Sequence, residues 1–290
     1  MFDKILIASD LSEASSEMIR CTQGLRLLGS REAILFHALR IRHLEDLKYE
    51  LARLAEPRLQ KQKDELEALG FVTKIEIASS ETAFELERTA RKEDISLVVI
   101  ATHGKSLLQH ALLGGEATKI IQHHTKPVLV VRIAVIEGEG GRKCEASCLD
   151  LSRKVLYATD FSDTAQRAFT YVEKMVENGW KKITLLHVQD SSRIDKYLKE
   201  RLDEFNSIDT ERLEMLKDVL VKKGASEVDI AISYGLPFQE ILKTAKSDLY
   251  SIIVMGSQGR GFSEELFLGS VSHNVVRHAP IPALLVPALR

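Results

Sequence analysis

The chain has 290 residues, a formal net charge of −2 and 44% hydrophobic residues, so we expect a globular protein of about two ordinary domains. The near-neutral charge offers no basic stripe for nucleic acid. No apolar run approaches the roughly 18–20 residues that span a bilayer, and the N-terminus is strand-like rather than signal-like. A cytoplasmic location without membrane contact is therefore expected.

Short apolar runs alternate with helical patterns along the first half of the chain. Five runs predict strands at residues 4–9, 33–39, 72–78, 97–102 and 127–133. Helical patterns lie between them at residues 12–29, 44–69, 82–92 and 116–123. Proline removes a helix hydrogen bond and clashes with the preceding turn, so Pro57 is expected to kink or split the second helix.

The second half repeats this order of elements. Its predicted strands lie near residues 154–159, 183–188, 228–233, 251–256 and 282–286. Its predicted helices lie near residues 163–177, 194–223, 238–246 and 270–278. The second of these helices is expected to break at Asn206 and Ser207.

The two halves also resemble each other in sequence. DKILIASDLSEASS from Asp3 returns as RKVLYATDFSDTAQ from Arg153, and ATHGKSLLQHALLGGE from Ala101 returns as GSQGRGFSEELFLGSV from Gly256. The first pair is offset by 150 residues and the second by 155. A repeat this long indicates a duplicated domain, because solenoid units have periods of roughly 20–50 residues.

Strands that alternate with helices predict right-handed crossovers and a parallel sheet covered on both faces. We therefore expect an α/β fold with two tandem doubly wound, Rossmann-like domains, each with a five-stranded parallel sheet. The domains would span residues 1–135 and 153–290. Residues 136–152, which are glycine-rich and charged, are predicted to form a linker.

Ligands of open parallel sheets bind beyond the carboxyl ends of the strands. In the second half, Asp160 follows Ala158 at the end of the first strand, Val188 follows the second strand, and residues 256–270 follow the fourth. Asp160 suits the adenosine part of a nucleotide, and the main chain of Val188 can contact a base edge. Glycine lets backbone N–H groups approach a phosphate closely, and Ser270 begins a helix whose positive end attracts anions.

Each of these features also has an ordinary structural explanation. An aspartate at a strand end commonly caps the following helix, and a G-x-x-G loop is more often a turn than a phosphate site. Their joint position at one sheet edge, in the same order in both halves, favours a ligand site.

The spacing of the second glycine loop is specific: Gly256 and Gly259 are followed by nine residues and then by Gly269 and Ser270. This pattern, together with KVLYATDFSDTA and LLHV, resembles the universal stress protein family, whose ATP-binding members carry G-x2-G-x9-G-[ST] after the fourth strand. The resemblance covers both repeats.

The resemblance implies that the protein binds ATP, or ADP or AMP, with a magnesium ion bridging the phosphates. Asp160, Ala158 and the Val188 main chain would hold the adenosine. The implied phosphate-binding residues, with Arg260 as a charge partner, are Gly256, Gly259, Arg260, Gly269, Ser270, Val271 and Ser272.

The first half departs from this motif. Ala101 replaces the first glycine, Gly115 stands where Ser or Thr is expected, and Glu116 adds a carboxylate in the first helical turn. That carboxylate would satisfy the helix dipole and repel a triphosphate. The first site is predicted to be weak or empty, and adenosine binding there is left open. The residues it keeps are Asp10, Gly104 and Gly114.

The histidines and cysteines give weaker signals. His37 and His187 occupy equivalent positions, which indicates a structural role, and His124 lies at a helix C-terminal turn that favours a positive charge. Cys21 is predicted to be a small buried hydrophobic residue. The roles of Cys144 and Cys148, a C-x3-C pair in the expected linker, are left open.

Three functions remain under comparison. The first is an ATP-binding regulatory protein with little or no turnover, the second a slow ATPase or nucleotidyl transferase at the same site, and the third a scaffold without nucleotide. The absence of an evident catalytic base favours the first. The apolar fifth strands, PVLVVRI and PALLV, would lie at sheet edges, so we expect the two domains to pair through them within one chain. A further homodimer is compatible with this arrangement.

Overall fold

The computed structural model describes residues 1–39, 45–79, 81–104, 114–138, 141–146, 151–197, 199–247, 249–259 and 268–288. The chain forms two compact units, Met1–Leu149 and Asp150–Arg290. Each unit has five parallel strands and helices on both faces, which confirms the predicted doubly wound α/β fold.

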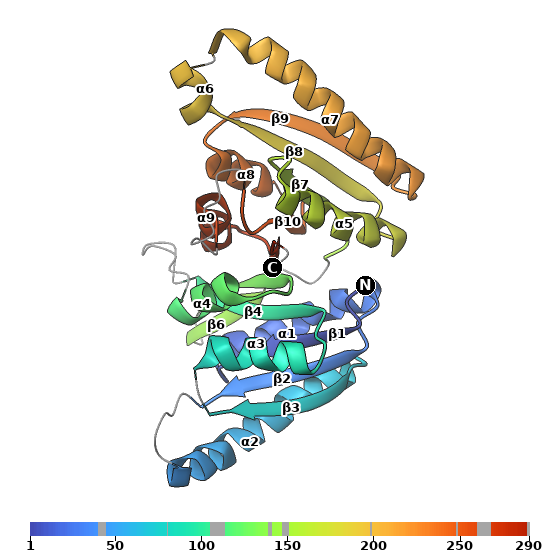
Figure 1. Ribbon diagram of the computed structural model, residues 1–290. Coiled ribbons are helices and arrows are strands. Elements are labelled where there is room, and N and C mark those ends of the chain that lie inside the picture. The colour runs from blue at the N-terminus through green and yellow to red at the C-terminus, as the bar shows by residue number, and fades with distance from the viewer. Residues whose placement is uncertain are drawn as a thin grey trace. The chain divides into compact units, whose positions relative to one another are not determined.

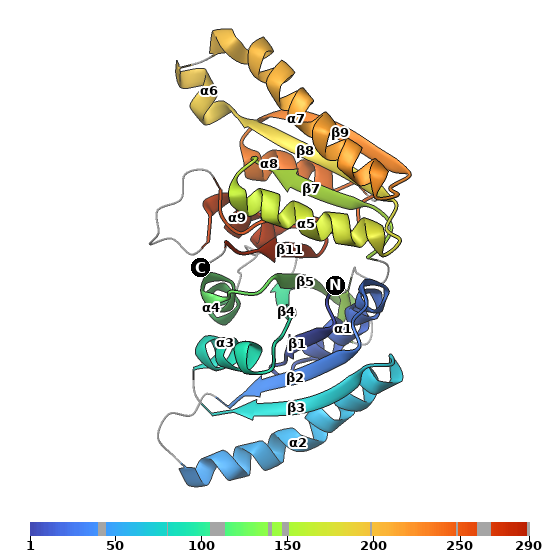
Figure 2. The same cartoon turned by 45° about the vertical axis from the view of Figure 1, so that its right-hand side comes forward.

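The first unit has the strand order β3-β2-β1-β4-β5, with parallel pairing among these five strands (Figure 1, Figure 2). Its parallel strands are β1 Lys4–Ala8, β2 Glu32–Ala38, β3 Val72–Ala78, β4 Leu97–Gly104 and β5 Val128–Gly138. Its helices are α1 Glu13–Cys21, the 3-10 helix η1 Thr22–Leu28, α2 Glu45–Ala68, α3 Thr82–Lys92 and α4 Gly115–His123. Helix α1 contacts α2, and α3 contacts α4. The buried apolar runs of the central strands are typical of a parallel sheet covered on both faces.

A sixth strand extends this first sheet. Strand β6, Gly141–Ala146, pairs antiparallel with the end of β5. Part of the segment that the sequence predicts as a linker is therefore a hairpin strand. Its glycines and charges are typical of a loop, and its pairing depends on a partner strand that local composition does not reveal. The proposed domain bounds, 1–135 and 153–290, stay a prediction.

The second unit has the strand order β11-β10-β7-β8-β9, again with parallel pairing (Figure 2). Its strands are β7 Val155–Thr159, β8 Lys182–Asp190, β9 Glu227–Gly235, β10 Ile252–Gly256 and β11 Ala283–Val286. Its helices are α5 Asp163–Glu177, α6 Ser191–Tyr197, η2 Lys199–Arg201, α7 Leu202–Lys222, α8 Pro237–Ala245 and α9 Ser270–His278. Helix α5 contacts α7, and α8 contacts α9.

Two helix interruptions differ from the prediction. Helix α2 runs continuously through Pro57, because Leu59 and Leu66 are fully buried and this packing outweighs a proline penalty of about 3 kcal/mol. In the second unit, α6 and α7 are separate elements joined through Lys199–Arg201, whereas Asn206 and Ser207 lie inside α7. The predicted break at Asn206 is therefore wrong.

Cys21 is more than a buried hydrophobic residue. It ends α1, is 1% exposed and is disulfide-bonded. The chain has two other cysteines, Cys144 and Cys148, whose side chains lie outside the described part of the structure. Sequence spacing alone did not pair a helix cysteine with either of them.

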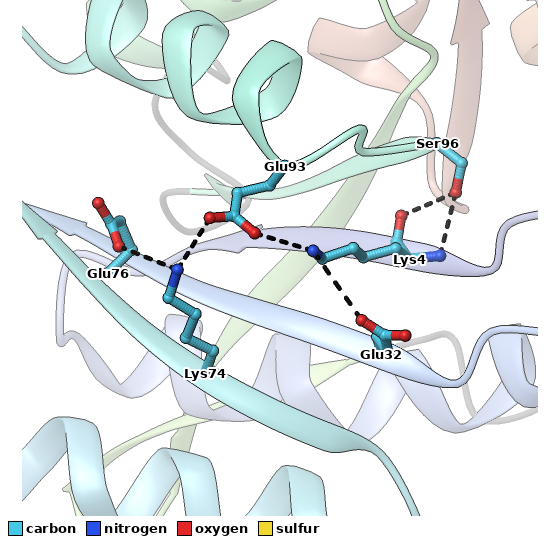
Figure 3. A network of polar contacts seen from close by, with 6 residues as sticks. All are labelled: Lys4, Glu32, Lys74, Glu76, Glu93 and Ser96. Carbon is cyan, nitrogen blue, oxygen red and sulfur yellow. Dashed lines mark hydrogen bonds and ion pairs between the residues drawn. The ribbon is translucent and has the colours of Figure 1, made fainter.

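The amino ends of the first unit's strands are tied together by a polar cluster (Figure 3). The Lys4 ammonium lies 2.9 Å from a Glu93 oxygen, and the Lys74 ammonium lies 2.8 Å from the other. Hydrogen bonds from Lys74 and Lys4 lower the pKa of Glu93 to about 2. The Ser96 hydroxyl donates to the Lys4 carbonyl at 2.7 Å. These groups satisfy one another, and ligands of parallel sheets bind at the opposite, carboxyl ends of the strands.

Candidate functional site

The candidate site lies where β7 and β10 end, at the point where the strand order of the second unit reverses direction. From β7 the chain proceeds through β8 to β9 on one side, and β10 then pairs with β7 on the other side. Ala158 of β7 is in register with Met255 of β10, so Asp160 and Gly256 follow at the same sheet edge. Open α/β sheets bind ligands in the crevice at this switch point.

Asp160 forms the turn between β7 and α5. One carboxylate oxygen, Oδ1, accepts hydrogen bonds from the Ser162 amide at 3.1 Å and from its hydroxyl at 2.6 Å. Ser162 is in turn the N-cap of α5 and accepts from the Ala165 amide. The aspartate therefore holds the cap without being the cap itself. Its other oxygen, Oδ2, faces the glycine loop.

Gly259 lies directly against that second oxygen. A Cβ atom at Gly259 would stand 2.6 Å from Oδ2 of Asp160, well inside contact distance. Because Gly259 has no side chain, the backbone of the loop can approach the carboxylate closely. The structure brings together the two residues that the sequence predicted to be neighbours.

Gly256 is explained by packing instead. A Cβ atom there would lie 2.9 Å from Cγ2 and 3.0 Å from the carbonyl carbon of Thr164, at the start of α5. The glycine lets α5 lie close to β10. The expectation that Gly256 opens the backbone toward a phosphate gains no support from this contact.

We expect Gly256→Ala to destabilise the protein by about 1–3 kcal/mol, because the added methyl must displace the backbone of α5. Calorimetric unfolding of the variant, without nucleotide, measures this loss. Gly115→Ala is the comparison, since a Cβ at Gly115 meets no atom within 4 Å. A Gly256→Ala unfolding temperature equal to the wild-type value contradicts the packing role.

Gly269 has no comparable packing duty. Its φ of −67° and ψ of 148° suit any residue, and a Cβ there would meet its nearest neighbours, Ser257 and Gln258, only at 3.4 Å. Its amide donates to the Ser257 carbonyl at 2.8 Å, which closes the loop between β10 and α9. Gly269 is the N-cap of α9 and brings no side chain to the N–H groups of the first turn. Such a helix end can receive an anion.

The three residues after Gly269 differ in exposure and in hydrogen bonding. Ser270 is the exposed first residue of α9, one position after the N-cap, so it does not cap the helix. Val271 is half-buried. The Ser272 hydroxyl is buried and donates to the Gly256 carbonyl at 2.9 Å. Ser272 therefore offers a ligand its main chain and not its hydroxyl.

Other predicted residues are placed as follows. Ala158 is buried inside β7, and Val188 lies half-buried in β8, paired with Ser233 of β9. Arg260 lies outside the described residues.

Sequence reasoning missed the residues behind Asp160. Phe161 has a left-handed φ of 58°, and Leu11, the equivalent residue of the first unit, has a φ of 63°. Asp209 and Arg212 of α7 reach the same place from a distant segment. A signal was present, since both repeats place a large apolar residue directly after the aspartate, at a turn position that favours glycine or asparagine.

The corresponding place in the first unit is built differently. Asp10 is exposed, and its Oδ1 accepts from the Ser12 amide at 3.0 Å and the Ser15 hydroxyl at 2.6 Å. Gly114 is the N-cap of α4, and Glu116 of the first turn lies 3.7 Å from the Lys119 ammonium. Gly104 ends β4, and residues 105–113 of the loop lie outside the described part of the chain.

The histidines follow the predictions in part. His37 and His187 each place Nδ1 against the carbonyl of the first strand's end, at 2.8 and 2.7 Å, which agrees with a structural role. The prediction for His124 is wrong. It is buried beside Glu87, and burial lowers its pKa below the ordinary 6.5 despite that carboxylate, so it is neutral near pH 7. Desolvation outweighs the helix dipole here.

Two negative findings concern the described residues alone. Among them, no three His, Cys, Asp or Glu side chains gather in a way that could hold a metal ion. No helix in those parts of the chain has both the length and the apolar character needed to cross a membrane.

Comparison with known proteins gives consistent relatives. The universal stress protein family model matches residues 1–132 and 152–287. Universal stress protein MJ0577 of Methanocaldococcus jannaschii is 33% identical over 153 residues, which is 46% of this chain and 94% of that protein. A universal stress protein of Thermus aquaticus is 32% identical over 136 residues, 46% of this chain and 98% of its own length.

A solved structure extends the likeness to the whole chain. The crystal structure of a universal stress protein from Archaeoglobus fulgidus covers 99% of both chains, with a TM-score of 0.78 and 23% identity. This likeness shows the shared two-unit fold. Because the family model also matches nearly the whole chain in two segments, the chain belongs to the universal stress protein family.

Proposed function

We propose that this protein is a stress-response regulator that binds ATP, or ADP or AMP, mainly in its C-terminal domain, with little or no turnover. The observation that carries the proposal is the close approach of Gly259 to Asp160 at the switch point, beside the side-chain-free N-cap of α9. The Asp160 carboxylate suits a ribose, and the uncapped N-terminus of α9 suits phosphates.

In this proposal Asp160, Ala158 and the main chain of Val188 hold the adenosine. Gly259, Gly269 and the first-turn amides of α9 receive the phosphates, with Arg260 as a charge partner. A magnesium ion would take its ligands mainly from the nucleotide's phosphates and from water, because the phosphate-binding groups named here are N–H donors. When bound, it would neutralise phosphate charge.

The first domain is proposed to bind nucleotide weakly or not at all. Its α4 begins with the carboxylate of Glu116 already in the first turn and paired with Lys119. A triphosphate at that helix end would meet like charge. Asp10 retains the turn of Asp160 and supports at most an adenosine contact there.

The test is nucleotide content. We expect mass spectrometry of denatured, freshly purified protein to release close to one adenine nucleotide per chain, and titration calorimetry to show ATP binding after the nucleotide is removed. Hydrolysis is followed in the same sample, where turnover well above the uncatalysed rate would favour the enzymatic alternative. If no nucleotide is released and no binding heat is seen with ATP and magnesium, the third function is favoured, a scaffold that binds no nucleotide.

We also propose a cytoplasmic location and pairing of the two domains through their apolar fifth strands, with a homodimer as a further level of assembly. Exposed apolar strands at a sheet edge are usually covered, which supports this pairing. NMR relaxation distinguishes one tumbling body from two, and light scattering gives the number of chains.

A further inference from the structure

The turn that carries Asp160 is held in a conformation that its sequence does not favour. Phe161, directly after the aspartate, has a φ of 58°. A bulky residue in the left-handed region is strained, so the surroundings must hold it there. Part of the hold is local, since the Phe161 amide donates to the Thr159 hydroxyl at 3.0 Å.

The Phe161 ring also lies in a stack with two other side chains. The His187 ring lies 4.7 Å from it, centroid to centroid, at an interplanar angle of 37°. The guanidinium carbon of Arg212, on α7, lies 5.2 Å from the centre of the same ring. A cation over an aromatic face and a tilted ring pair each stabilise an arrangement of this kind.

Both partners of the ring are fixed by one buried carboxylate on α7. Asp209 is 8% exposed, its Oδ2 lies 3.4 Å from Nε2 of His187, and its Oδ1 lies 3.8 Å from Arg212. Gln189 donates to the same Oδ2 at 3.1 Å. His187 is also fixed at its other nitrogen by the Thr159 carbonyl at 2.7 Å. A buried carboxylate is costly unless it is paired in this way.

The first unit has the same left-handed turn after its aspartate. Leu11 takes the left-handed conformation with φ of 63° and offers no aromatic face. There the Ser9 hydroxyl accepts from the Leu11 amide at 3.1 Å and donates to the side-chain oxygen of Gln62 on α2 at 2.7 Å. The turn itself therefore does not require an aromatic ring after the aspartate. The ring, with its contacts to His187 and Arg212, belongs to the unit whose glycine motif is complete.

We infer that the stack positions Asp160 for the ribose of the nucleotide and links α7 to that contact. This inference rests on the proposed function. It adds residues that do not contact the nucleotide in that proposal but act through Asp160. The positioning residues are Phe161, His187, Asp209 and Arg212.

The experiment compares ATP with 2′,3′-dideoxy-ATP, which lacks both ribose hydroxyls, by titration calorimetry on the full chain. The wild-type protein should prefer ATP by about tenfold or more, the equivalent of one or two hydrogen bonds. In Phe161→Leu and Asp209→Asn this preference should fall to within about threefold, while the affinity for dideoxy-ATP stays within about threefold of the wild-type value, by the same reasoning.

If these residues had only a structural role, their substitution would weaken the binding of ATP and of dideoxy-ATP equally and leave the preference for ATP unchanged. Arg212→Met is the third test variant. It replaces Phe161→Leu or Asp209→Asn if either of these does not fold, because the Arg212 side chain is 45% exposed. Its matched control is Lys217→Met, which removes a cation from another i,i+3 pair of the same helix, that with Glu214. An unchanged preference in all three test variants overturns the inference and leaves the proposed function standing, whereas wild-type protein that binds neither nucleotide overturns the proposed function itself.

Discussion

Gly269→Val is expected to weaken ATP binding by about 100-fold or more while the protein stays folded. The valine side chain would occupy the space before the first turn of α9, where the proposed phosphates meet uncapped N–H groups. The fold tolerates a Cβ there, because its nearest neighbours lie 3.4 Å away and the backbone angles are ordinary. Calorimetric titration with ATP and magnesium measures the affinity, and thermal unfolding without nucleotide measures the stability.

Gly114→Val is the matched comparison. Gly114 is also the N-cap of its helix, α4, so both variants carry the same penalty of about 1 kcal/mol for replacing a capping glycine with a β-branched residue. A Cβ at Gly114 meets no atom within 4 Å. We expect its ATP affinity to change less than about twofold, a difference of under about 0.4 kcal/mol. Equal losses in the two variants would contradict the assignment of nucleotide to the C-terminal domain.

The parallel core could be predicted from the sequence because its signals are local. Runs such as Leu97–Val99 are apolar at every position, which is typical of strands covered on both faces, and the glycine punctuation between elements is equally plain. The order of elements then limits the topology, since crossovers between parallel strands are right-handed. Strand β6 escaped prediction because its pairing with β5 depends on contact, not on composition.

The candidate site was predictable in position but not in the duty of each residue. A sequence shows that Gly256, Gly259 and Gly269 are glycines, and it does not show what a side chain at each would meet. The structure assigns the first to packing against α5, the second to the approach of Asp160, and leaves the third without a packing reason. Phe161 and Arg212 were missed for a similar cause, since their contact joins a turn to a helix more than forty residues later.

Lys154 is where we expect the largest loss of stability from removing one charge. Its side chain is only 10% exposed, and its ammonium lies 2.8 Å from Glu227 and 2.6 Å from Asp229 on β9. Burial alone would lower the pKa of Lys154, but the hydrogen bonds to Asp229 and Glu227 outweigh it and raise the pKa above 10.5. The backbone of Lys154 is also joined to Ser251 at the start of β10, so the residue links three strands.

Lys154→Met should cost about 2 kcal/mol, because it leaves two carboxylates facing each other without their shared cation. The estimate lies below the range for fully buried pairs, since Glu227 and Asp229 are 42% and 56% exposed and water can solvate them. The chain's single tryptophan, Trp180, is 2% exposed in the same unit, so its fluorescence during urea unfolding reports on this domain.

Lys182→Met is the control for this measurement. Lys182 also pairs with Glu227, at 3.3 Å, but its side chain is 55% exposed, and loss of such a surface pair costs about 0.5 kcal/mol or less. Equal midpoints for the two variants would mean that burial of the Lys154 ammonium adds nothing to its pairing. A larger shift for Lys154→Met would show that this buried charge cluster, at the amino ends of the strands, stabilises the second unit. The cluster would then lie at the end of the sheet opposite to the edge where the proposed nucleotide binds.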